Sequence, residues 1–423
     1  MWTRGGQLLV KEPFSPMIKR IAAIAFIFIC TSIAWAILGS TIFMRTYSSG
    51  SQLKGRVTSS WGSSQDQAPP TAGYEQVTEQ NVTALENGLS VTRRGQEKKW
   101  IVLPLERSRV NADLNIGYRQ KGLLWYSTYG VKFAGVYDFK NSDHEPHVVT
   151  LTLHLPADQA IYDGLSFTVN GTPFTAQNAK RDAYVVFPMK GGETATVNVS
   201  YNSQGLDGWS YNFGDGVTEV KNFELHARTN FQTFNVSENA LSPTEETRQK
   251  DGWDLEWKYD NLLSGYRIGI DLPQKLQPGP VAGRISYFAP VSLLFFFFVI
   301  FVLTTVQGMD LHPMNYFFMA CAFFSFHLLM AYLVDHISIH LAFVVCSAVS
   351  VFLLVSYLRL VVGMKFAAVQ AGLAQFVYLV LFSYAFFFDG YTGLSITIGA
   401  ILTLFVIMQM TARVQWAQKF ATH

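Results

Sequence analysis

Residues 285–306 read ISYFAPVSLLFFFFVIFVLTTV, a run in which no side chain is charged. An α-helix needs roughly 20 apolar residues to cross the hydrocarbon core of a bilayer, so this run is long enough. It is too long and too uniformly apolar for a strand of a membrane barrel, where apolar and polar side chains alternate. The run therefore predicts a membrane-spanning helix, from which the rest of the chain can be interpreted.

Apolar runs of similar length follow this one, and another lies near the N-terminus. We expect six spans in all, at residues 21–44, 285–306, 314–334, 339–362, 366–388 and 394–410. The connections among the last five are short, so neighbouring helices should form antiparallel hairpins. The sequence thus predicts a transmembrane anchor over 21–44 and a five-helix transmembrane bundle over 285–412.

Two interpretations compete for the first span. A cleavable signal peptide would use Ala34-Trp35-Ala36 as its small-x-small site. However, the apolar run continues through Phe43 and reaches a full bilayer width. This length favours an uncleaved anchor.

Positive side chains near the span ends indicate the orientation, because cytoplasmic loops are enriched in Lys and Arg. If residues 1–20 are cytoplasmic, then Arg359, Lys365, Arg413 and Lys419 all fall on the same side. We therefore expect both termini, 1–20 and the tail 413–423, in the cytoplasm. Residues 45–284 would then lie outside the cytoplasm, in the periplasm if the cell is a Gram-negative bacterium.

Alternation of apolar and polar residues dominates the region between the first two spans. It is clearest at 147–155, 182–187, 194–201 and 219–231, with a turn signal at Asn170-Gly171. This pattern predicts a large, mainly antiparallel β-sandwich, either as one domain or as two. Ser and Gly dominate much of 45–75, which predicts a tether, and Pro278-Gly279-Pro280 predicts a break before the second span.

Composition argues against several classes of protein. The net charge of +2 gives no electrostatic reason to expect nucleic acid. All three cysteines, Cys30, Cys321 and Cys346, lie in the apolar runs, so the β domain is not a disulfide scaffold. The chain has no G-x-S-x-G elbow and no glycine-rich phosphate loop, and the β domain has no cysteine nucleophile. We therefore expect no enzyme activity, catalytic residue or cofactor.

Ionisable residues inside membrane spans are the best functional candidates, because they are costly in lipid. His327 lies near the middle of the third span, where Gln370, Gln375 or Tyr378 of the fifth span would be its hydrogen-bond partner. The alternative is a packing histidine bonded to a neighbouring helix.

Asp335, His336 and His340 cluster at the expected outer end of the third and fourth spans. Their nitrogen and oxygen atoms suit a divalent metal ion. No H-E-x-x-H arrangement accompanies them, so a turn cap is the favoured interpretation and no metal is expected.

Two further groups in the β domain have a functional and a structural interpretation. The basic run 93–99, followed by Arg107 and Arg109, would meet anionic lipid headgroups or form an ordinary solvated surface. The aromatic residues between Trp125 and Tyr137 would line a groove or fill the core. The structural interpretation is favoured in both cases.

Several segments have a recognisable sequence: HPMNY at 312–316, FFSFHLL at 323–329 and YLVDH at 332–336, with RQKGLL at 119–124 and GVYDF at 135–139 upstream. These segments resemble CreD, a family of bacterial inner-membrane proteins often described as cell envelope integrity proteins. The resemblance is strongest after residue 284. The chain departs from it at Pro69-Pro70, where the family tends to have Gly-Pro.

The resemblance implies an inner-membrane protein that supports envelope integrity or the response to envelope stress, and it brings no catalytic mechanism. We expect the β domain to bind a membrane lipid, an envelope protein or a wall fragment. The alternatives are a transporter of lipid or small amphiphiles that uses His327 and Gln375, and a membrane-embedded metal-dependent hydrolase that uses Asp335, His336 and His340.

Overall fold

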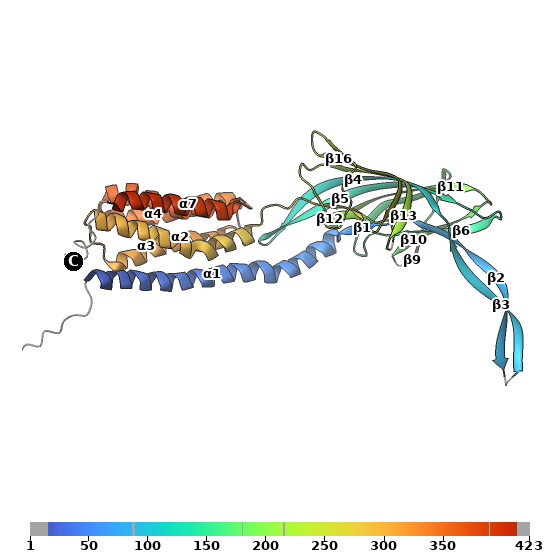
Figure 1. Cartoon of the computed structure of the whole chain (residues 1–423), viewed down its shortest axis with the longest axis horizontal. Coiled ribbons are helices and arrows are strands. Elements are labelled where there is room, and N and C mark those ends of the chain that lie inside the picture. Colours follow the sequence, from blue (N-terminus) through green and yellow to red (C-terminus); the bar gives the residue numbers. More distant parts are fainter. Residues whose placement is uncertain (1–15, 87–88, 180, 215, 389, 413–423) are drawn as a thin grey trace, which may run out of the picture. The chain divides into compact units, whose positions relative to one another are not determined.

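The structure is a computed structural model that describes residues 16–86, 89–179, 181–214, 216–388 and 390–412. Its contacts divide the chain into two compact units (Figure 1). The helical unit lies within Met1–Ser51, Gly122–Leu124 and Leu276–His423, and the β unit comprises Gln52–Lys121 and Trp125–Lys275.

Six helical segments among the described residues are long and apolar enough to cross a membrane, by length and composition. The helices are α1 (Pro16–Trp61), α2 (Pro278–Val306), α3 (Pro313–Leu333), α4 (Ile339–Val362), η1 (Phe366–Ala371), α5 (Gly372–Gln375), η2 (Phe376–Leu381), α6 (Phe382–Tyr384), η3 (Ala385–Phe387) and α7 (Thr392–Thr411). The elements from η1 to η3 form the fifth apolar segment, and η1 and η2 are π-helical. Of the expected cytoplasmic ends, 1–20 and 413–423, residues 1–15 and 413–423 lie outside the described residues, and residues 16–20 belong to α1.

The expected break at Pro278-Gly279-Pro280 is wrong, because α2 begins at Pro278. Proline is tolerated in the first turn of a helix, where its missing N–H would have no intrahelical partner. The proline motif therefore starts the second apolar helix instead of preceding it.

The expected tether over 45–75 is also wrong. Helix α1 continues to Trp61, and strands follow at Gln65–Gln67 and from Thr71. Ser59 and Ser60 lie in this helix, and each donates from Oγ to the Arg56 carbonyl, 3.0 Å away. The helix ends where Gly62 adopts a φ of +101°, a conformation that favours glycine. The Ser- and Gly-rich composition of this segment hid a continuous helix.

The β unit contains three sheets, as expected for a large, mainly antiparallel β domain. Its strands are β1 (Gln65–Gln67), β2 (Thr71–Glu86), β3 (Leu89–Val102), β4 (Leu105–Lys121), β5 (Leu124–Lys140), β6 (His147–His154), β7 (Tyr162–Val169), β8 (Thr172–Phe174), β9 (Gln177–Ala179), β10 (Asp182–Met189), β11 (Thr194–Leu206), β12 (Gly208–Tyr211), β13 (Thr218–Thr229), β14 (Asn235–Val236), β15 (Glu245–Arg248), β16 (Trp253–Ser264) and β17 (Ile268–Asp271).

The strand orders are β15-β16-β13-β4-β5-β11-β7-β8, β3-β2-β6-β10-β9 and β1-β12-β17-β14. Most pairs are antiparallel, whereas β13 with β4 and β1 with β12 are parallel. Asn170 and Gly171 both have positive φ between β7 and β8, which confirms the expected turn. That the sheets form a sandwich stays a prediction.

Buried side chains from all three sheets belong to one hydrophobic cluster. Trp209, Tyr211 and Trp257 are among its largest fully buried members. The β unit therefore has a single core, which answers whether one or two β domains are present.

Strands β2 and β3 form a two-stranded ribbon that leaves the other strands of the β unit (Figure 1). Their register runs from Gly73 opposite Val102 to Glu86 opposite Leu89. The next sheet partner, β6, pairs with β2 only over Thr71–Gly73. Beyond this root, the two strands pair with each other.

Candidate functional site

A group of ionisable side chains lies on the outer face of β13 and β16. Strand alternation turns Phe223, Leu225 and Ala227 into the core, so Glu224 and His226 point to the opposite face. His226 lies directly opposite Glu256 of β16 in the antiparallel register. Directly opposed residues share a face, so Glu224, His226 and Glu256 are brought together.

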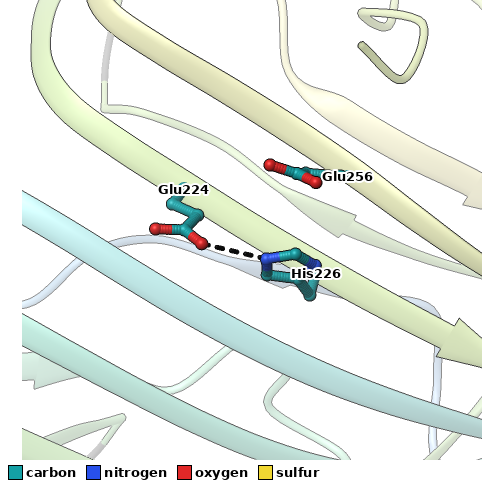
Figure 2. Close-up of side chains that lie close together, drawn as sticks. All are labelled: Glu224, His226 and Glu256. Atoms are coloured by element: carbon teal, nitrogen blue, oxygen red, sulfur yellow. Dashed lines mark hydrogen bonds and ion pairs between the residues drawn. The ribbon is translucent and has the colours of Figure 1, made fainter. Parts of the chain in front are cut away.

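The three side chains of this outer-face group offer one donor atom each, all within 4.8 Å of one another (Figure 2). His226 Nε2 lies 3.0 Å from Glu224 Oε1, and His226 Nδ1 lies 3.8 Å from Asp254 Oδ1. The hydrogen bond from His226 lowers the pKa of Glu224 below its ordinary value, and the nearby Arg109 adds to this effect. About a third of the Glu224, His226 and Asp254 side chains is exposed.

The sequence analysis missed this outer-face group. The pattern Glu-x-His within an alternating segment indicates that Glu224 and His226 lie on one face, because residues i and i+2 of a strand share a face. Glu256 could be added only from the register of β13 and β16, which no local pattern reveals. Glu245 and Glu246 lie in the exposed strand β15, with Glu245 opposite Glu256.

His327 is buried in α3, but its expected partner is wrong. Its Nδ1 lies 3.2 Å from the carbonyl oxygen of Phe323, on its own helix, and aromatic rings including Trp35 and Phe326 surround it. Among the described atoms, His327 Nε2 has no hydrogen-bond partner. His327 is thus a packed histidine with one free ring nitrogen, and no residue of the fifth segment bonds to it.

Gln375 instead joins three helical segments. Its Nε2 donates to Ser350 Oγ of α4 at 2.7 Å, and Ser350 Oγ donates to the Ala322 carbonyl of α3 at 2.5 Å. The two other expected partners of His327 bond elsewhere: Gln370 accepts from Gln307, and Tyr378 donates to Thr403. This polar link holds α3, α4 and α5 together, as interhelical hydrogen bonds do in membrane proteins.

Asp335, His336 and His340 do not form a joint metal site in the part of the chain that the structure describes. Asp335 Oδ2 forms an ion pair with Arg45 Nη2 of α1 at 2.6 Å. The His340 ring lies 5.2 Å from that of Phe387, and His336 is exposed. Asp335 and His340 thus have different partners, and the exposed His336 joins neither of them.

The other two groups noted in the sequence are structural where they are described. Lys98 pairs with Glu75, and Arg107 pairs with Asp138. The side chains of Arg93 and Arg94 lie outside the described residues. Within the aromatic group, Tyr129, Phe133 and Tyr137 are core residues, as the structural interpretation predicted.

The helical unit has an apolar groove of about 620 Å³ between α2, the fifth segment and α7. Phe295, Leu373 and Val406 contribute apolar walls, and Gln370 and Tyr378 lie in the π-helical elements η1 and η2. Departures from α-helical geometry of this kind are often found at functional sites. The groove does not include His327 or Gln375 among its lining residues.

Apolar helices joined to a sheet-rich domain define an integral membrane protein. Residues 220–417 match the family model "Inner membrane protein CreD", so the resemblance noted in the sequence is confirmed. The match covers just under half of the chain. A comparison with curated proteins gave no match.

Solved structures resemble the chain only weakly. A Legionella pneumophila protein described as nutrient binding is 10% identical, with a TM-score of 0.30, and the match covers 45% of this chain and 74% of that one. An M1 zinc metallopeptidase from Deinococcus radiodurans is 12% identical, with a TM-score of 0.24, and the match covers 40% of this chain and 42% of that one. The chain thus spans less than half of the metallopeptidase, and neither TM-score establishes a shared fold.

Proposed function

We propose that this protein supports the integrity of the bacterial cell envelope from the inner membrane. In this proposal the β unit lies on the periplasmic side and binds an envelope component. The observation that carries it is a large β domain inserted between the apolar helices α1 and α2 of a chain whose C-terminal half matches an inner-membrane family.

Two ion pairs of α1 fit a bilayer-length span between Arg20 and Arg45, whichever end is cytoplasmic. Arg20 Nη1 lies 2.9 Å from Asp310 Oδ1 in the α2–α3 connection, and Arg45 pairs with Asp335 after α3. Arg20 and Arg45 are 25 residues apart, which is about 38 Å along a helix that rises 1.5 Å per residue. That length fits a bilayer about 40–45 Å thick including its headgroups. The α2–α3 and α3–α4 connections would therefore lie at opposite surfaces, and in the proposed orientation Arg20 is at the cytoplasmic one.

Aromatic and basic side chains favour a lipid headgroup as the component that the β unit binds. The Arg119 guanidinium lies 4.0 Å from the Trp61 ring, and Lys275 Nζ lies 4.4 Å from the rings of both Tyr118 and Trp125. Trp61 is the last residue of α1, and Lys275 closely precedes α2. Trp and Tyr are enriched at membrane interfaces, and clustered basic side chains attract anionic lipids.

Deleting the gene should make cells more sensitive to detergents and to drugs that act on the wall. The full chain should restore resistance, and an Arg119→Ser/Lys275→Ser variant should restore it only in part because two cations near the interfacial rings are lost. Survival at graded doses is the measurement. An Arg181→Ser variant, which removes an exposed arginine paired with Asp158, is the matched control and should restore resistance fully. Unchanged resistance in the deletion strain would contradict the proposal.

The apolar groove supports a second candidate function, which is binding or transport of a lipid or a small amphiphile. Its volume and apolar walls suit an acyl chain, and Gln370 and Tyr378 add polar groups for a headgroup or a substituent. In the transporter hypothesis, the groove therefore replaces His327 and Gln375 as the expected binding site.

Filling the groove should reduce labelling of the full chain by a photoreactive fatty acid several-fold. Gly399 lines the groove and has no neighbouring heavy atom within 4 Å of where a Cβ would lie, so Gly399→Leu would project into open space. Gly393, on the same helix, has equal space but does not line the groove, so Gly393→Leu should label like the wild type. Equal labelling of both variants and the wild type would exclude the groove as the binding site.

A further inference from the structure

We propose that Glu224, His226 and Glu256 bind a divalent transition-metal ion, of which Zn²⁺ is the best fit. The group is built by the sheet itself: two side chains come from alternate positions of β13, and the third comes from the directly opposed position of β16. Figure 2 shows the imidazole of His226 beside both carboxylates. The proposal concerns the β unit and is independent of any lipid that the protein binds.

The distances suit a zinc ion after small side-chain rotations. Zinc lies about 2.0–2.2 Å from nitrogen and carboxylate oxygen ligands, so adjacent donors of a tetrahedral site are about 3.3–3.6 Å apart. His226 Nε2 and Glu224 Oε1 are already 3.0 Å apart, and all three donors lie within 4.8 Å. The imidazole favours a transition metal, because Ca²⁺ and Mg²⁺ are bound mainly by oxygen.

Asp254 provides a second, independent reason to expect a metal. A metal-bound histidine almost always donates its other ring N–H to a carboxylate or a carbonyl. His226 Nδ1 faces Asp254 Oδ1 at 3.8 Å, and this oxygen is buried without a hydrogen-bond partner among the described atoms. With Nε2 on the metal, Nδ1 must carry the proton, and a small ring rotation would bring it to Asp254.

Charges of both signs surround the group: Arg109 and Lys258 lie near Glu224, whereas Glu245 lies opposite Glu256. Arg109 Nε lies 3.5 Å from Glu224 Oε2, which leaves Oε1 on the side of His226. The carboxylate of Glu256 has no ion-pair or hydrogen-bond partner within the described part of the chain. Glu245 of β15 lies directly opposite Glu256, so two carboxylates are neighbours on the same face. A bound cation would relieve this like-charge repulsion.

The test is calorimetric titration of the purified, EDTA-treated full chain in detergent with ZnCl₂. The wild type should have one more zinc site than either His226→Asn or Glu256→Gln, and zinc should raise its unfolding temperature but not theirs. Asp254→Asn should keep the site but weaken its affinity by about 10- to 100-fold, because Asp254 acts only through His226. CaCl₂ should not replace zinc.

The matched control is His154→Asn. His154 Nδ1 lies 2.7 Å from Asp182 Oδ1 across β6 and β10, so this pair has an imidazole and one carboxylate without the third donor. The His154→Asn variant should bind zinc like the wild type. All variants should unfold at the wild-type temperature in EDTA, because the substituted side chains lie on the outer face. The proposal is overturned if His226→Asn or Glu256→Gln retains the zinc stoichiometry of the wild type, or if CaCl₂ binds the same site equally well.

Discussion

Replacing Trp257 with alanine should destabilise the β unit by about 3–5 kcal/mol, the usual cost of truncating a buried aromatic side chain. Trp257 is fully buried in the middle of β16, and it packs in the single core shared by the three sheets. Its Nε1 also donates to the Leu241 carbonyl at 2.9 Å. The substitution therefore leaves both a cavity and an unpaired carbonyl.

Urea unfolding of the full chain, followed by the circular dichroism of the strands, measures the effect of Trp257→Ala. Trp100→Ala is the matched control, because Trp100 is 53% exposed on the β2–β3 ribbon. It should change the unfolding midpoint little. Equal midpoints for the two variants would mean that Trp257 does not contribute to the core as the structure indicates.

Replacing Gly252 with alanine should cost about 3 kcal/mol or more, since forcing extra atoms into a packed site strains the backbone. A Cβ atom at Gly252 would lie 1.8 Å from the carbonyl oxygen of Thr229 and 2.6 Å from its carbon. Both are backbone atoms, so a rotamer change cannot relieve the clash. The turn before β16 would have to move away from the end of β13.

Thermal unfolding of the full chain is the measurement for Gly252→Ala, with Gly130→Ala as the control. Gly130 lies in β5, and the atom nearest to a Cβ at this position would be the Ser203 carbonyl oxygen at 3.9 Å, an ordinary contact. Alanine should therefore be tolerated at Gly130. A Gly252→Ala protein that unfolds at the wild-type temperature would show that the turn is not fixed by this close approach.

Hydropathy predicted the apolar helices well because lipid-length apolar runs have few alternative structures. The segment 339–362 has the bounds that were expected for α4. The prediction of a tether was wrong over residues 45–61 because Ser and Gly are common in linkers. In this helix the side chains of Ser59 and Ser60 instead bond to the previous turn. Composition alone does not determine whether such a segment forms a helix or a loop.

Contacts between distant segments were the part that the sequence could not supply. The position of His327 inside a span was clear, but its neighbours depend on how each helix rotates about its axis. Likewise, the pairing of His226 with Glu256 depends on the register of two strands that are 30 residues apart. Local periodicity specifies which face a residue occupies and leaves its partner on the next element open.

The β2–β3 ribbon gives the β unit a part that can melt separately. Two paired strands without a third strand or a covering layer are marginally stable in water. Beyond Gly73 and Val102, the described residues of β2 and β3 pair only with each other. Unzipping can begin at the Glu86–Leu89 pair and stop at the root, leaving the three sheets and their common interior intact.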